Sequence, residues 1–127
     1  MNYNPRIVSA LSNIGIEVFP DFYDAKKKRV DNNGNELPEL SEWIAFNYVG
    51  ESPVLHGDDE DIEEETMLDV HHYTKNKLKA LETKELIKKK LRYAGFTIES
   101  TIPPSYESET GLYHTTVTVS DTDFTEV

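Results

Sequence analysis

The sequence predicts an α/β protein of the α+β type with two layers: a mostly antiparallel sheet of four to five strands and two helices on one face. Apolar residues recur at helical spacing near the start of the chain and again over residues 85–94. Runs of β-branched and aromatic residues complete the order helix, three strands, helix, two strands. The 127 residues, 37% of them hydrophobic, suit one compact core, so we expect a single domain over 1–127.

The first helix is expected to begin at Asn4 and to end at Gly15. Asparagine caps helices well, Pro5 suits the first helical position, and glycine is a typical helix stop. The apolar residues between them have helical spacing: Ile7, Val8, Leu11 and Ile14. Residues 16–19 then predict a short strand, which Pro20 ends.

Residues 24–41 are charged and turn-forming, so we interpret them as a polar insertion in the domain. The Asn33-Gly34 pair is a strong hairpin signal, with Val30 and Leu37 as apolar contacts on the two arms. We expect a projecting loop or β-arm that is mobile when the protein is alone. A tolerated surface insertion and an interaction arm are equally good interpretations. The candidate residues of the arm are Lys26, Lys27, Lys28, Arg29, Asn33 and Gly34.

The strongest strand signal covers residues 42–49, with an end expected at 50–53. Alternation places three apolar side chains toward the helices: Ile44, Phe46 and Tyr48. Trp43 falls on the other face, where packing at the edge is favoured over a contact with another subunit.

The next strand is expected over residues 66–73, and its alternation separates two adjacent histidines. One face carries Leu68, Val70 and His72, and the other carries Met67, Asp69, His71 and Tyr73. Because neighbouring strand residues point to opposite faces, His71 and His72 are not expected to bind one metal ion together. We expect His72 to be packed and hydrogen-bonded.

The second helix is expected over residues 85–94 and is closed by Gly95. Its apolar face consists of Ala80, Thr83, Ile87, Leu91 and Ala94. Leucines within residues 76–82 would point away from this face in an unbroken helix, so a break with a new cap is expected near Thr83. Residues 96–101 and 112–120 predict an antiparallel pair of strands, with a loop from Pro103 to Gly111 between them.

The formal net charge of −11 argues against sequence-specific nucleic-acid binding, because phosphate binding requires a cationic surface. Seven carboxylates lie within residues 58–65: Asp58, Asp59, Glu60, Asp61, Glu63, Glu64 and Glu65. Eight of the 13 basic residues lie within residues 75–92. These runs are either a solvated loop and a solvated helix face, or opposite charges through which identical subunits meet head to tail in a ring. No stretch has the length and apolarity of a membrane span or the pattern of a signal peptide, so we expect a soluble intracellular protein without membrane partners.

No pattern for catalysis, a cofactor or a metal ion is complete in the sequence. The chain has no cysteine, no phosphate-binding glycine loop, no G-x-S-x-G elbow and no H-E-x-x-H helix. The acidic run lacks the ligand spacing of a calcium loop. We therefore expect no enzyme activity and no cofactor, and a metal-dependent enzyme that uses His56, His71 or His72 is only the third choice.

As an ordered set, several segments resemble the small tail-completion or tail-terminator proteins of long-tailed bacteriophages and their prophage copies. The segments are Ile14 to Tyr23, Ile44 to Tyr48, Leu55 to Asp59, Leu68 to Tyr73, Leu91 to Phe96 and Glu107 to Tyr113. The likeness covers nearly the whole chain, and the insertion at 24–41 departs from it.

The resemblance implies a structural virion protein in the tail, found in the host cytoplasm during assembly. Members form a ring of six copies at the head-proximal end of the tail, where they end tube growth and join tail to head. The implied partners are other copies of the chain, the tail-tube protein and the head connector or stopper protein. In this account, Asp58 to Glu65 line the lumen or a partner interface. The alternative is a small intracellular protein-binding or regulatory module that pairs through its sheet edge.

Overall fold

In the computed structural model, the described residues are 4–21, 23, 28–55 and 62–125, and for 4, 51–55, 62–65 and 122–125 only the backbone is described. The helices are α1 (Asn4–Leu11), followed by a 3-10 turn (Ser12–Ile14), and α2 (Lys77–Tyr93). The strands are β1 (Val18–Pro20), β2 (Arg29–Val30), β3 (Glu36–Leu37), β4 (Glu42–Leu55), β5 (Ile62–Thr74), β6 (Thr97–Glu107) and β7 (Leu112–Thr125).

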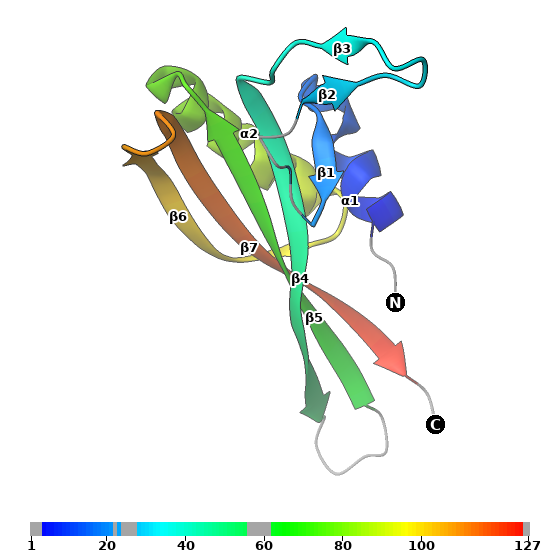
Figure 1. The fold of residues 1–127 in the computed structure, drawn as a ribbon. Helices are drawn as coiled ribbons and strands as arrows, with labels where there is room; N and C mark the ends of the chain where they lie inside the picture. Colours follow the sequence, from blue (N-terminus) through cyan, green and yellow to red (C-terminus); the bar gives the residue numbers. More distant parts are fainter. Residues whose placement is uncertain (1–3, 22, 24–27, 56–61, 126–127) are drawn as a thin grey trace.

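A five-stranded sheet in the order β1-β4-β5-β7-β6 forms the centre of the fold (Figure 1). β1 pairs with β4 in parallel, and all the other neighbours are antiparallel. The predicted α+β class is therefore confirmed, with β2 and β3 as a separate two-stranded sheet.

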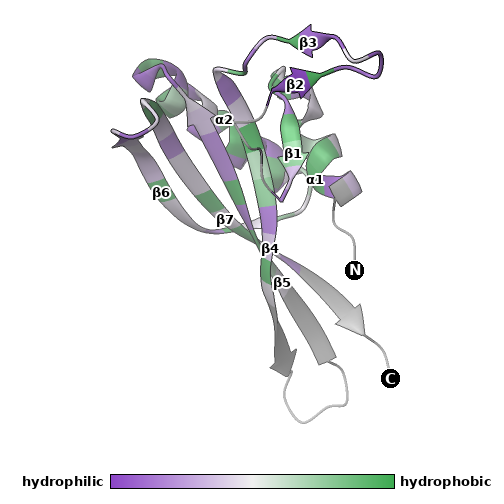
Figure 2. Ribbon diagram, in the orientation of Figure 1, coloured by the Kyte–Doolittle hydropathy of each residue, from purple (hydrophilic) through white to green (hydrophobic). Residues whose placement is uncertain are grey.

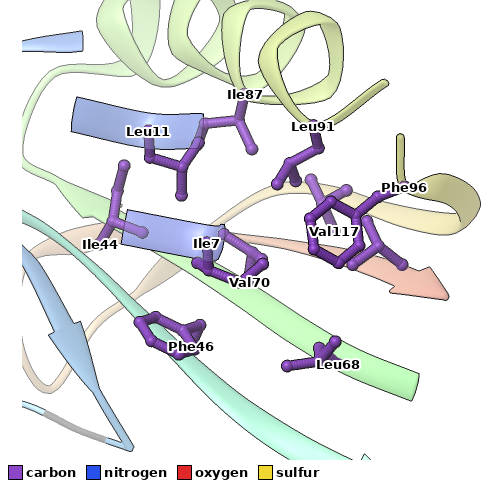
Figure 3. Packing of buried hydrophobic residues seen from close by; sticks show 11 residues of the cluster. Ile7, Leu11, Ile44, Phe46, Leu68, Val70, Ile87, Leu91, Phe96 and Val117 are labelled. Carbon is purple, nitrogen blue, oxygen red and sulfur yellow. The ribbon is translucent and has the colours of Figure 1, made fainter. Parts of the chain in front are cut away.

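The main core lies between the two helices and one face of the sheet (Figure 3). Each helix contributes a pair of fully buried side chains one turn apart, Ile7 with Leu11 and Ile87 with Leu91. They pack on alternate residues of the central strands: Ile44, Phe46, Leu68, Val70, Val117 and Val119. In the strands every second residue is buried, and in α1 and α2 the buried residues recur at helical spacing. Both helices therefore lie on the same face of the sheet, as predicted.

The second helix is one continuous element, so the expected break near Thr83 is wrong. Thr83 is buried in the helix interior, and the N-cap is Asn76, whose side chain accepts a hydrogen bond from Lys79 N at 2.9 Å. Gly95, at φ +98°, ends the helix and lets Phe96 N donate to Leu91 O. The leucines that suggested a break are exposed on the outer face of the helix.

Several expected strand ends are also wrong. β5 begins at Ile62 instead of residue 66, and β7 continues to Thr125 instead of ending at residue 120. β4 continues through 50–53 to Leu55 after a bulge between Tyr48 and Gly50, and Tyr48 is 50% exposed instead of facing the helices. Pro103 and Pro104 lie inside β6 at a second irregularity, not in a loop. Edge strands tolerate proline because their outer N–H groups have no ladder partner to lose.

Three strands continue beyond the helices as an extension of the sheet (Figure 1). The extension consists of β4 from Gly50 to Leu55, the first residues of β5 and the last residues of β7, with Leu55 opposite Ile62 and Ile62 opposite Thr125. Because six strand residues span about 20 Å, the extension is about 20 Å long.

Candidate functional site

The face of the sheet away from the helices carries a second cluster of buried residues. Trp43 and Ala45 of β4 and Leu112 of β7 form its centre, and four partly buried residues pack around them: Phe19, Tyr23, Leu40 and Tyr73. Trp43 is therefore packed within the chain, as the sequence favours.

Aromatic rings form a row across this face, perpendicular to the strands. Ring centroids are 4.7 Å apart between Phe19 and Tyr23, and 4.9 Å between Tyr23 and Trp43. The row continues from Trp43 to Tyr73 at 5.1 Å and from Tyr73 to His114 at 4.3 Å. These separations are typical of favourable aromatic pairs, so the row is a preformed apolar surface.

Beside this row lies an open depression of about 700 Å³. Its wall combines aromatic and aliphatic side chains with four carboxylates and one lysine: Asp21, Tyr23, Glu39, Leu40, Trp43, Ala45, Asn47, His71, Tyr73, Lys75, Glu107, Glu109, Thr110 and Leu112. The depression lies where β4 and β7 begin and β5 ends, at the opposite end of the sheet from the extension. Its chemistry suits a partner that is apolar and cationic.

A polar network borders the depression. His71 Nε2 lies 2.8 Å from Asn47 Oδ1, and His71 Nδ1 lies 2.8 Å from His114 Nε2. Burial lowers the pKa of His71, so its imidazole is neutral at pH 7 and has one N–H. That N–H donates to Asn47, and Nδ1 accepts from His114. His114 Nδ1 is in turn 3.2 Å from Glu107 Oε2.

His72 points into the opposite face, as its strand position predicts. Its side chain is fully buried, and Nε2 lies 2.8 Å from the Glu42 carboxylate. Burial lowers the pKa of His72, which makes it a neutral hydrogen-bond donor. No group of three potential metal-binding side chains occurs within the described residues.

The residues chosen from the acidic run are only partly within the described chain. Asp58, Asp59, Glu60 and Asp61 lie outside the described residues, as does His56. Glu63, Glu64 and Glu65 are backbone members of β5 in the extension. Glu63, Glu64 and Glu65 therefore lie at the end of the sheet away from the depression.

In the arm, Lys26 and Lys27 lie outside the described residues, while the predicted hairpin is present (Figure 2). Gly34 turns the chain at φ +83°, next to Asn33. Lys28 pairs with Glu36 at 3.0 Å, and Arg29 binds the Glu17 carboxylate at 3.0 and 3.1 Å. Val30 and Leu37 remain exposed, so the ion pair of Arg29 with Glu17, rather than apolar packing, holds the arm next to the start of β1.

Sequence reasoning missed the depression, since its residues come from separate loops and strands. Tyr23, Leu40 and Glu107 meet only when the order β4-β5-β7-β6 is known. One signal in the sequence could have located the depression: Trp43 and Tyr73 both fall on the strand face that does not meet the helices. The structure makes them direct partners across β4 and β5.

No protein family and no curated protein matches the chain in sequence comparisons. Among the described residues, no helix is long and apolar enough to cross a membrane.

Proposed function

We propose that this chain is a structural virion protein that forms a ring at the head-proximal end of a phage tail, ends tube growth and joins the tail to the head. It acts by assembly and without catalysis. The single observation that carries the proposal is the three-stranded extension of the sheet beyond the helices (Figure 1).

The extension has two outer edges that are unpaired within the described chain. β1 pairs with β4 only up to Phe46, and β6 pairs with β7 only from Leu112 to Ser120. Open strand edges expose backbone N–H and C=O groups that readily pair with another chain. Such open edges promote aggregation of an isolated protein, whereas in an assembled subunit they pair with neighbouring chains.

In this proposal the negative charge of the extension suits it to line the channel of the ring. Seven of the chain's 24 carboxylates lie in residues 58–65, within or next to the extension. Carboxylates that line a channel repel DNA phosphates and so prevent DNA from binding to the wall. The partners in this proposal are five further copies, the tail-tube protein and the head connector.

The depression favours a second candidate function, a small protein-binding or regulatory module. Aromatic side chains next to a few polar groups are typical of binding sites. Such a module would act without a ring and would have no effect on tail length.

Deletion of the gene from the phage or prophage that carries it tests the proposal. We expect separate heads and tails of unregulated length in electron micrographs, restored to normal virions by the wild-type chain supplied in trans. Normal virions from the deletion strain would contradict the proposal and favour the binding module.

The role of the acidic run needs its own variant. Replacing Asp58, Asp59, Glu60 and Asp61 with their amides is expected to lower infectivity by interfering with the lumen or a partner contact. Replacing the exposed residues Glu36 and Glu82 with glutamine is the control. Unchanged assembly and infectivity in the first variant would remove the acidic run from the account.

A further inference from the structure

Two complementary surfaces lie on opposite sides of this fold. The first is the depression on the helix-free face of the sheet, whose rim includes the carboxylates of Asp21, Glu39, Glu107 and Glu109 against the single cation of Lys75. Its interior presents the rings of Trp43 and Tyr73. This surface attracts a cationic partner and offers apolar contact once the partner is seated.

The second surface is the outer face of α2, defined here by Leu78, Leu81, Leu86, Lys89, Arg92 and Tyr93. At 100° per residue these residues point away from the buried side of the helix, where Ile87 and Leu91 lie. The helix carries seven lysines and arginines against two glutamates, a net charge of +5 in a chain whose net charge is −11.

The outer face of α2 is also unusually apolar for a solvated helix. Leu78 is 65% exposed and Tyr93 is 93% exposed, with Leu81 and Leu86 also exposed between cationic side chains. A solvated helix face needs cations for solubility but gains nothing from four large apolar residues. Apolar anchors surrounded by charge are the usual composition of an interface.

We propose that the outer face of α2 of one copy seats in the depression of the next copy, so that identical subunits associate head to tail. The contact rests on the ring proposed above, for which it names the two surfaces. Lysine and arginine of α2 meet the acidic rim, and leucine and tyrosine meet the aromatic interior. Because the two surfaces differ and lie on opposite sides of the molecule, every copy uses both, and a suitable rotation between copies closes a ring.

Cross-linking tests the contact directly, since the chain has no cysteine and introduced thiols are unique. Tyr93→Cys places a thiol on the outer face of α2, and Glu109→Cys places one at the rim of the depression. Under mild oxidation of an equimolar mixture, we expect 93–109 dimers to exceed 93–93 and 109–109 dimers several-fold. Asn33→Cys, in the exposed hairpin, is the control partner. Equal yields for all pairs, or no cross-link at the highest soluble concentration, would overturn the contact.

A charge exchange gives an independent test in solution. One variant combines Lys89→Glu with Arg92→Glu, and the other combines Glu39→Lys with Glu109→Lys; all four residues are exposed. Each variant alone juxtaposes like charges and should stay monomeric by light scattering, while circular dichroism reports an unchanged fold. In a mixture, reversed helices fit reversed depressions and wild-type helices fit wild-type depressions, so association should return. A mixture that stays monomeric, or single variants that associate like the wild type, would overturn the proposal.

The two proposals fail separately. Selective 93–109 cross-links together with normal virions from the deletion strain would leave the head-to-tail contact in place and remove the tail function. Unregulated tails together with unselective cross-links would keep the tail function and remove this contact.

Discussion

At the scale of single residues, Arg6 fastens α1 to the rest of the fold. Its guanidinium pairs with the carboxylate of Asp121 in β7 and donates to Ala94 O at 3.0 Å. It also lies 4.4 Å from the centre of the Phe96 ring. One side chain therefore links α1, the end of α2 and β7.

Replacing Arg6 with methionine is expected to lower the free energy of unfolding by about 1–3 kcal/mol, because it leaves the carboxylate of Asp121, 8% exposed, without its partner. Chemical denaturation measures the loss. Arg6→Lys, which keeps the charge but not the forked donor, should lose less. Equal stability of Arg6→Met and the wild type would show that the pair contributes nothing.

His72 predicts how stability depends on pH. Burial holds its folded-state pKa below the ordinary value of 6.5, so the unfolded chain binds a proton more readily than the folded chain. The contribution of His72 is complete above pH 6.5 and is lost as the pH falls toward the folded-state pKa. His71 has the same direction of shift and adds to the effect.

His72→Gln is therefore expected to flatten the pH dependence of the unfolding free energy by up to about 1.4 kcal/mol per pH unit below pH 6.5. Denaturant titrations of both proteins from pH 8 to pH 5 provide the measurement. Above pH 7 the two curves should run parallel. An identical slope below pH 6.5 would mean that His72 has no shifted pKa.

At the scale of elements, the cap of α2 sets where the helix begins. Asn76→Ala removes the side-chain oxygen that accepts from Lys79 N and should cost about 1 kcal/mol. Asn76→Asp keeps an oxygen at this place and should be close to the wild type in thermal denaturation. If alanine and aspartate behave alike, the cap does not stabilise this helix.

The sequence allowed the type of each main helix and strand to be predicted, but not several of the residues at which these elements begin or end. The buried stripe of Ala80, Thr83, Ile87 and Leu91 matches helical periodicity. The expected break at Thr83 failed since the outward leucines were assumed to need a core within the same chain. Gly50 and the proline pair in β6 interrupt strands only by bulges, because both strands are edges at these places.

The depression was beyond sequence reasoning for a physical reason. A strand pattern shows which face a side chain takes, but not which strand lies beside it. His114 reaches His71, and Glu107 reaches His114, only because β7 pairs with β5 and β6 with β7 in this register. The cationic run over residues 75–92 was visible in the sequence, whereas the acidic rim of the depression was not, because its carboxylates are scattered along the chain.

At the scale of the whole molecule, the head-to-tail contact predicts a strong dependence on salt. Charges at the rim of an interface are screened beyond about 8 Å at physiological ionic strength. The association constant should fall steeply between about 50 and about 500 mM NaCl in sedimentation experiments. Tyr93→Ala should weaken association at every salt concentration without changing the slope. Association that is independent of salt would contradict a contact between α2 and the acidic rim.

The most direct measurement is the native mass of the wild-type chain by light scattering over a wide concentration range, with negative-stain images of the same samples. Head-to-tail assembly predicts closed rings whose population grows with concentration, with a mass near six copies of the 14.5 kDa chain, about 87 kDa. A strict monomer or a closed two-fold dimer at every concentration would contradict head-to-tail ring assembly.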